Sequence, residues 1–318
     1  MTELFLAFFN RSVSALYLVL AVLAVRLVFR RAPKWVSPLL WALVALRLLL
    51  PVSLHSSFSL VPESEVIPPA LVEAVTPAPG IRSDPPAADS TILSPLPGEE
   101  TPLPSPAADA TGSLLSAVSG VWLAGIAVML TYALVSYLRL RRRVADAVPL
   151  SGGLYRSERV ASPFILGIMR PRIYLPLSLG GQDLDCVLAH ERAHLARRDH
   201  WWKPLGFVLL ALYWFNPLLW LAYVLFCRDV ELACDERVVK TLSASQRADY
   251  SQALLSCSVP RSMIAACPVA FGEVGVKERV GRVLSYQKPA VRLVVLSLLA
   301  CAALAVCFLT DPPRETMR

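Results

Sequence analysis

Histidine is scarce in this chain: only four of its 318 residues are histidines, and three of the four lie between positions 190 and 200. Cysteine is absent from the segment 53–115, and no two of the seven cysteines have the C-x-x-C spacing of a metal site. A disulfide framework or a cysteine-based zinc site is therefore not indicated, and packing is the expected role of the cysteines. The net charge of +7 is weak evidence for nucleic-acid binding, and we expect none.

Hydrophobic residues make up 55% of the chain, and its mean hydropathy is +0.54. This apolar share is higher than that of an ordinary soluble domain, and the apolar residues are concentrated in runs. Each run is long enough to cross a bilayer core of about 30 Å. The sequence therefore predicts a mainly α membrane protein with four transmembrane helices, at about 13–29, 36–52, 116–138 and 293–309.

The distribution of lysine and arginine predicts the orientation of these spans, because positively charged loops stay in the cytoplasm. The connection 26–34 carries four basic residues, whereas the segment 53–115 carries one basic residue against eight acidic ones. The region 139–292 contains 22 of the 31 basic residues. We therefore expect 139–292 to be a cytoplasmic domain, and the loop 53–115, the tail 310–318 and both termini to be external.

The predicted external loop is rich in proline and almost free of aromatic residues. Twelve of the 26 prolines lie between Pro62 and Pro106, mixed with alanine, serine and acidic residues. Such a composition cannot bury a core. We expect a flexible, partly polyproline-like tether, with a receptor role as the alternative.

Residues 190–194 read His-Glu-Arg-Ala-His and predict a metal site on a helix. Two histidines four residues apart project from the same helical face, so one divalent metal can contact both. Zinc held by His190 and His194 needs a third protein ligand, and Glu231 offers one. Glu191 leans toward the same pocket and is a candidate general base that deprotonates water for attack on a carbonyl. An accidental match on a helix surface is the alternative, which the low histidine content disfavours.

Two neighbouring segments of the cytoplasmic region have patterns of their own. Residues 152–176 alternate apolar and polar positions around turn signals, which predicts short strands. An edge strand beside the metal helix would hold an extended peptide by strand addition, or would only pack under the helix.

The apolar stretch 204–226 is interrupted by Asn216-Pro217. We expect a membrane-associated apolar hairpin there, either re-entrant or lying in the interface.

Together these residues resemble a known family, the integral-membrane zinc metallopeptidases typified by the beta-lactam sensor-transducers, or antirepressors, of bacteria. The likeness covers most of the chain, and several linked motifs in the right order are more specific than the metal motif alone. The motifs are Trp41-Ala-Leu-Val-Ala-Leu-Arg-Leu-Leu-Leu-Pro51, Ser162-Pro-Phe-Ile-Leu-Gly167 with Arg170-Pro-Arg-Ile-Tyr-Leu-Pro176, His190-Glu-Arg-Ala-His194 with Arg197-Arg-Asp-His200, Trp214-Phe-Asn-Pro217 and Glu231-Leu-Ala-Cys-Asp-Glu236.

The resemblance implies a gluzincin-like α+β peptidase domain in which the two histidines and Glu231 bind zinc and Glu191 is the general base. Asp235 lies four residues after Glu231, where glutamate-zinc peptidases carry an aspartate that orients a ligand histidine. Tyr250 is a candidate to stabilise the tetrahedral oxyanion, a role that peptidases of this kind require some residue to fill.

By resemblance, the chain is a zinc endopeptidase of the bacterial cytoplasmic membrane that acts in signal-dependent proteolysis. Its polypeptide substrate would be a cytosolic winged-helix transcriptional repressor, the chain itself, or both, and it could form a homo-oligomer. Two alternatives stay open: a non-proteolytic membrane transducer stabilised by zinc, and a housekeeping peptidase for membrane proteins. The best-known members carry an external penicillin-binding domain after the last span, where this sequence has 310–318. We therefore do not expect direct sensing of beta-lactams.

Overall fold

The computed structural model describes residues 2–50, 54–55, 106–257 and 275–311 of the chain, and most of these residues are helical. The helices are α1 (Thr2–Val28), α2 (Val36–Leu49), α4 (Pro106–Arg143), α5 (Gly181–Arg197), α6 (Asp199–Leu212), α7 (Pro217–Val239), α8 (Ala244–Ser256), α9 (Val276–Leu284) and α10 (Val291–Leu309). The strands are β1 (Leu54–His55), β2 (Val148–Pro149), β3 (Leu154–Ser157), β4 (Phe164–Leu166), β5 (Arg172–Pro176) and β6 (Thr310–Asp311), with a short 3-10 helix at Ser151–Gly153.

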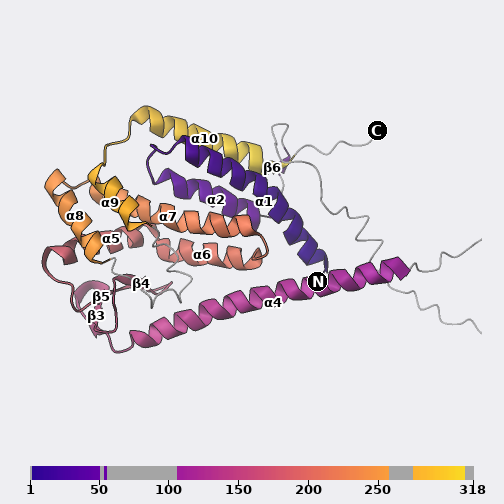
Figure 1. Cartoon of the computed structure of the whole chain (residues 1–318), viewed down its shortest axis with the longest axis horizontal. Helices are drawn as coiled ribbons and strands as arrows, with labels where there is room; N and C mark the ends of the chain where they lie inside the picture. Colours follow the sequence, from indigo (N-terminus) through magenta and orange to yellow (C-terminus); the bar gives the residue numbers. More distant parts are fainter. Residues whose placement is uncertain (1, 51–53, 56–105, 258–274, 312–318) are drawn as a thin grey trace, which may run out of the picture.

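Helices α1, α2, α6, α7 and α10 pack together as one bundle, and α4 runs along its α6 side (Figure 1). The bundle has a continuous apolar core that includes Val22 of α1, Trp41 of α2 and Tyr223 of α7. The sheet and the helices α5, α8 and α9 lie at one end of the bundle (Figure 1). The molecule therefore divides into an apolar bundle and a more polar cap, which α6 and α7 connect.

Among the described residues, α1, α4 and α10 are long and apolar enough to cross a membrane. The predicted third and fourth spans lie inside α4 and α10, respectively, whereas α1 begins at Thr2, well before the predicted residue 13. The predicted second span, 36–52, appears as a helix of 14 residues, shorter than the roughly 20 residues of a typical span. It ends there because Pro51 disfavours a helical conformation at Leu50, whose backbone is extended. A mainly helical membrane protein is confirmed.

The predicted external segments fall mostly outside the described residues. Of the loop 53–115, the structure describes β1 and the beginning of α4, and of the tail 310–318 it describes β6. Strands β1 and β6 pair in parallel, Leu54 opposite Thr310. The start of the tail therefore lies beside the start of the loop.

The apolar stretch 204–226 forms a helical hairpin from α6 and the first half of α7. Asn216 is the N-cap of α7, and its side chain accepts a hydrogen bond from the Leu218 backbone N–H at 3.0 Å. Pro217 takes the first helical position, where a missing N–H donor has no cost. Asn216-Pro217 therefore both interrupts the apolar stretch and starts α7, the second helix of the hairpin.

The tip of this hairpin is enclosed by other helices of the bundle. The Tyr213 hydroxyl donates a hydrogen bond to the carbonyl of Leu48, at the end of α2, over 3.0 Å. On another side, the Trp122 indole of α4 donates to the carbonyl of Leu212 over 2.9 Å. Tyr213 has no exposed surface. The hairpin penetrates the bundle along its length, which favours the re-entrant alternative over a helix lying in the interface.

A buried ion pair fixes α7 to α1 and α2. The Arg26 guanidinium donates two hydrogen bonds to the Asp229 carboxylate, each 2.8 Å long. The indole of Trp41 donates a third to the same carboxylate over 2.9 Å. Asp229 is only 2% exposed. A bidentate pair with a third donor offsets much of the cost of burying this charge, so α7 keeps a fixed depth in the bundle.

The small sheet lies beneath α5. Its strand order is β2-β3-β5-β4, with β3 parallel and β4 antiparallel to β5. Strands β3, β4 and β5 are the ones that the alternating pattern of 152–176 predicts. Ile173 and Leu175 of β5 pack in one apolar cluster with Val187 and Leu188 of α5. Among the described strands β4 pairs only with β5, so one edge of β4 is left open beside α5.

Candidate metal centre

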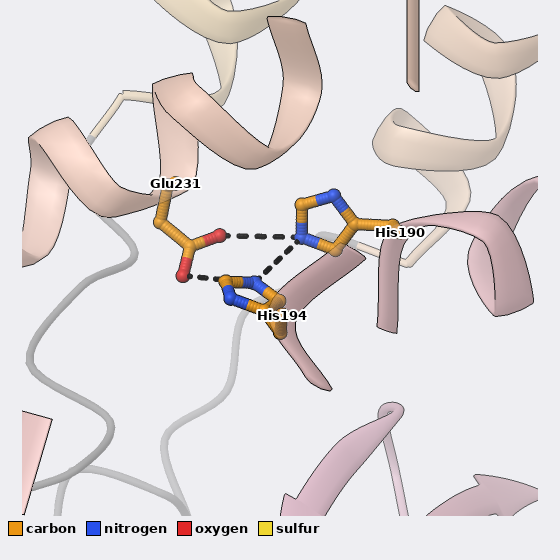
Figure 2. Close-up of side chains that lie close together, drawn as sticks. All are labelled: His190, His194 and Glu231. Atoms are coloured by element: carbon orange, nitrogen blue, oxygen red, sulfur yellow. Dashed lines mark hydrogen bonds and ion pairs between the residues drawn. The ribbon is translucent and has the colours of Figure 1, made fainter. Parts of the chain in front are cut away.

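Helix α5 presents both histidines of the predicted motif to the interior. Its apolar residues Val187 and Leu188 face the sheet, and this packing fixes the rotation of the helix. His190 and His194 are consequently buried, at 8% and 7% exposure. Their rings stand almost perpendicular with Nε2 atoms 3.1 Å apart (Figure 2). The helix ends at Arg197, and Arg198, with a left-handed backbone of φ 59°, is both its C-cap and the N-cap of α6.

Glu231 reaches the same point from α7 (Figure 2). Its Oε2 lies 3.4 Å from Nε2 of His190, and its Oε1 lies 3.5 Å from Nε2 of His194. Ligand atoms of the three residues all lie within 4.8 Å of one another. The hairpin makes this meeting possible, because α7 returns to the end of the bundle from which α6 departs.

The three residues fit a zinc ion. Two imidazole nitrogens and one carboxylate oxygen form a donor set that catalytic zinc sites use, and such a set leaves a fourth position open. Both Nε2 atoms face the carboxylate, while both Nδ1 atoms are held by other groups of the protein. The arrangement therefore directs Nε2 of each ring toward a common point near Glu231.

Two carboxylates hold the rear nitrogens of the rings. Asp199 Oδ2 lies 2.8 Å from Nδ1 of His194. On the other ring, Asp235 Oδ1 lies 3.2 Å from Nδ1 of His190. Such contacts keep the proton on Nδ1, orient the ring and raise the basicity of Nε2. Sequence reasoning assigned this position to Asp235 but missed Asp199.

The Tyr250 hydroxyl, the candidate oxyanion donor, lies behind the His190 ring. This hydroxyl is 2.9 Å from Nδ1 of His190 and donates to Asp235 Oδ1 over 2.8 Å. The side chain is 1% exposed and stands behind the imidazole, on the edge turned away from Glu231. In this geometry the Tyr250 hydroxyl contacts Asp235 and the rear nitrogen of His190, and the oxyanion role stays a prediction.

Two cations that sequence reasoning missed contact the carboxylates of the site. The Lys203 ammonium lies 2.8 Å from Glu231 Oε1. The Arg279 guanidinium donates to both oxygens of Asp235, over 2.7 and 2.8 Å, and its Nη1 lies 3.5 Å from Glu231 Oε2. Its Nη2 is 3.3 Å from Nε2 of His190. Arg279 therefore contacts the ligand nitrogen of His190 and also the Asp235 oxygen to which Tyr250 donates.

The electrostatics of the site follow from this crowding of charges. Burial alone would raise the pKa of Glu231, but Lys203 and the two histidines hold that pKa well below its usual value. Burial likewise opposes ionisation of Asp235, and the Arg279 guanidinium lowers the pKa of that carboxyl. For His190, burial lowers the pKa, yet hydrogen bonds to Asp235 and Glu231 outweigh it and raise the pKa to about 9. The pocket thus favours carboxylates in their charged, ligating form.

Glu191 is buried at 8% exposure on the same helix, next to His190. No hydrogen bond or ion pair joins its side chain to another of the described residues. Cys234 lies 3.2 Å from both His194 Nδ1 and Asp199 Oδ2. Burial raises the pKa of the Cys234 thiol well above its usual value, which favours a neutral, packed thiol.

The missed residues had different sequence signals. Asp199 stands five residues after His194 in the segment Arg197-Arg-Asp-His200, so a nearby carboxylate was visible, although the left-handed turn at Arg198 that aims it was not. Lys203 and Arg279 carried no motif. Only the folded structure brings them to Glu231.

Comparison with known proteins shows the family of the chain. The family described as BlaR1 peptidase M56 matches residues 6–283. Over 203 residues the chain is 29% identical to the "Regulatory protein BlaR1" of Bacillus licheniformis, which covers 54% of this chain and 33% of that protein. Over 138 residues it is 26% identical to the "Methicillin resistance mecR1 protein" of Staphylococcus aureus and of Staphylococcus epidermidis, covering 41% of this chain and 24% of those proteins.

The matched regions thus span about a third or less of the length of these curated relatives. The family match itself extends from the first helix, α1, to α9 and includes all three residues of the candidate metal centre. The chain therefore belongs to the BlaR1 peptidase M56 family of membrane metallopeptidases.

Proposed function

We propose that this protein is a membrane-embedded zinc endopeptidase that cleaves polypeptides on the cytosolic side of a bacterial membrane. The observation that carries the proposal is the convergence of His190, His194 and Glu231 within 4.8 Å, with the rear nitrogen of each histidine held by a carboxylate. A purely structural zinc site would fill all four positions with protein ligands, whereas this set supplies three. A gluzincin-like fold of the cap would explain why the ligands are two histidines and one glutamate, and why Glu191 lies beside them.

Bound zinc would supply a Lewis acid that polarises the scissile carbonyl and eases the deprotonation of water. Glu191 would accept that proton as general base and pass it to the leaving amine as general acid. Arg279, 3.3 Å from the ligand nitrogen of His190, is the cation placed to neutralise negative charge on the carbonyl oxygen. Lys203 and the two histidines also keep Glu231 in its charged form.

The open edge of β4 supports a polypeptide as the substrate. β4 lies at the rim of the sheet, and Ile165 of this strand packs in the same apolar cluster as Val187 and Leu188 of α5. An extended peptide that pairs with this edge gains backbone hydrogen bonds that are independent of its sequence. Such a mode would hold a substrate chain alongside the metal helix.

We further propose four transmembrane helices, with α2 as the short one. Its 14 residues extend for about 21 Å, and its far end is bonded to the hairpin tip within the bundle. Four crossings put both termini on the outer side and the metal centre on the inner side, as the excess of basic residues in 139–292 indicates.

A tag-accessibility experiment tests this topology. In spheroplasts, protease should remove epitope tags at both ends of the chain and should spare a tag inserted at Gly180, between β5 and α5. Detergent lysis must make the Gly180 tag sensitive, which serves as the control. If one terminal tag is spared while the other is removed, α2 does not cross and the four-span proposal is wrong.

Replacement of the general base tests the chemistry. Glu191→Gln should retain about one zinc per chain, because the ligands are unchanged, and should lower kcat by at least about a hundredfold, because general-base catalysis contributes a factor of about 10² to 10⁴. Metal analysis and a peptide-cleavage assay measure the two effects. Arg192→Gln, an exposed neighbour on α5, is the matched control and should behave as the wild type. Full activity of the Glu191 variant would exclude the scheme.

The carboxylates behind the histidines give a second test. Asp199→Asn and Asp235→Asn should each weaken zinc binding by roughly 10- to 100-fold, because the rings lose their orienting acceptors. Competition with a zinc chelator measures the affinity directly. Asp185→Asn, on an exposed position of α5, should leave it unchanged. Equal affinities for all three variants would show that these carboxylates do not support the site.

The substrate that we propose is a cytosolic transcriptional repressor, the chain itself, or both, in signal-dependent proteolysis. A non-proteolytic transducer stabilised by zinc and a housekeeping peptidase are the alternatives. The names of the relatives, a regulatory protein and a methicillin resistance protein, favour regulation. Direct DNA binding by this chain is not part of any of these proposals.

Substrate trapping separates these possibilities. Glu191→Gln protein isolated from its own cells should hold one or a few cytosolic proteins, with a repressor among them, that wild-type protein releases as fragments. His194→Ala, which removes a ligand, is the control for capture that does not depend on the site. A broad collection of membrane proteins would indicate the housekeeping role, and signalling that persists in the Glu191→Gln strain would indicate the transducer.

A further inference from the structure

A second pocket lies at the end of the bundle that carries the cap, next to the metal centre, with which it shares Asp235. It has a volume of about 690 Å³ and is formed by the connection between α1 and α2, one side of α7, and the connection between α9 and α10. Three helices therefore end or begin at its rim: α1 ends there, and α2 and α10 begin there. Because α1 and α10 are candidate membrane spans, the pocket opens at the depth where a bilayer surface meets the protein.

The lining of this pocket is strongly basic. It contains five cationic side chains and two carboxylates. One carboxylate, Asp235, is engaged by Arg279, and the other, Glu236, accepts a hydrogen bond from the backbone of Lys34. The five cations are Arg30, Arg31, Lys34, Arg282 and Lys288.

These cations are incompletely neutralised by the protein. Arg282 pairs with Glu278 over 3.0 Å, and the Lys34 ammonium donates to the carbonyl of Arg30. Within the described ranges, no ion pair involves the exposed side chains of Arg30 or Lys288. Burial is the main cause that lowers the pKa of Lys34 to about 8, and the nearby Arg282 lowers it further. An anion bound in the pocket would attract these cations and would raise the pKa of Lys34.

Two helix starts add positive potential to the same rim. Neither α2 nor α10 has a side-chain cap at its beginning. The first backbone N–H groups of a helix carry partial positive charge and bind phosphate oxygens readily. Cationic side chains and helix starts together match a phosphate-bearing anion, and the position at the ends of membrane helices favours a lipid over a soluble ion.

We propose that this pocket binds the phosphate headgroup of an anionic phospholipid in the cytoplasmic leaflet. Its inner wall is made by Leu232, Asp235 and Val239 of α7 and by Val283 of α9. The same two helices supply Glu231 and Arg279 to the metal centre. A bound headgroup therefore contacts the rear of the elements that position the metal ligands, and the pocket ties the cap to the membrane surface.

The test uses the full-length protein, delipidated in a neutral detergent and titrated with single lipids by native mass spectrometry. Phosphatidylglycerol should bind roughly tenfold more tightly than phosphatidylcholine with the same acyl chains. The double variant Arg30→Gln, Lys288→Gln should lose this preference. The matched control is Arg139→Gln, Arg143→Gln, two exposed cations at the end of α4 outside this pocket, and it should keep the preference.

Several outcomes would overturn the proposal. Equal binding of the two lipids by the wild type would exclude a headgroup site. An equal loss of preference in the pocket variant and in the control would assign the attraction to the general positive surface. Displacement of phosphatidylglycerol by millimolar inorganic phosphate, with the phosphate retained on the protein, would make the ligand a soluble anion. A melting curve of each variant checks that the exposed substitutions leave the fold intact.

Discussion

The meeting of Glu231 with His190 and His194 is the constraint on which the architecture depends. The histidines precede the apolar stretch in sequence and the glutamate follows it, yet their ligand atoms lie within 4.8 Å. A single crossing by that stretch would separate them by the thickness of the bilayer. The hairpin of α6 and α7 solves this problem, and its turn at Asn216 and Pro217 is as essential to the site as the ligands are. In this protein the packing of the apolar bundle therefore determines where the third metal ligand lies.

A second constraint is charge balance in a buried volume. His190, Glu231 and Asp235 are each about nine-tenths buried or more, together with Arg279 and Lys203. Isolated burial of any one of these charges would be very costly, but each carboxylate has a cation within 3 Å. The arrangement keeps the carboxylates ionised and the ring nitrogens oriented. A metal entering this pocket meets preformed ligands, which lowers the entropic cost of assembling them.

Much of this site follows from helical periodicity, whereas the remainder depends on tertiary contacts. The spacing of His190 and His194 predicts a shared face, and four residues also separate Glu231 from Asp235, which does lie behind His190. The sequence could not reveal Arg279, because it lies on α9 and reaches Asp235 only through the packing of α9 on α7 and α8. For Tyr250 the sequence offered a chemical role but no direction, and only the structure shows that its hydroxyl faces the rear of the His190 ring. Helix α2 ends at Leu49, before the end of the predicted span 36–52, because Pro51 disfavours a helical backbone at Leu50 although the apolar character continues.

The same helix carries both the anchor to the membrane bundle and the third metal ligand. Asp229 binds Arg26 of α1 and Trp41 of α2, and Glu231 follows two residues later. A helix transmits displacement along its axis with little loss over so short a distance, since its backbone hydrogen bonds resist stretching. A shift of α1 against α7 must therefore either break the buried pair, which leaves charges unpaired in an apolar bundle, or move Glu231 relative to the histidines. Breaking the buried pair is strongly unfavourable. The geometry of the metal centre therefore depends on the packing of the spans.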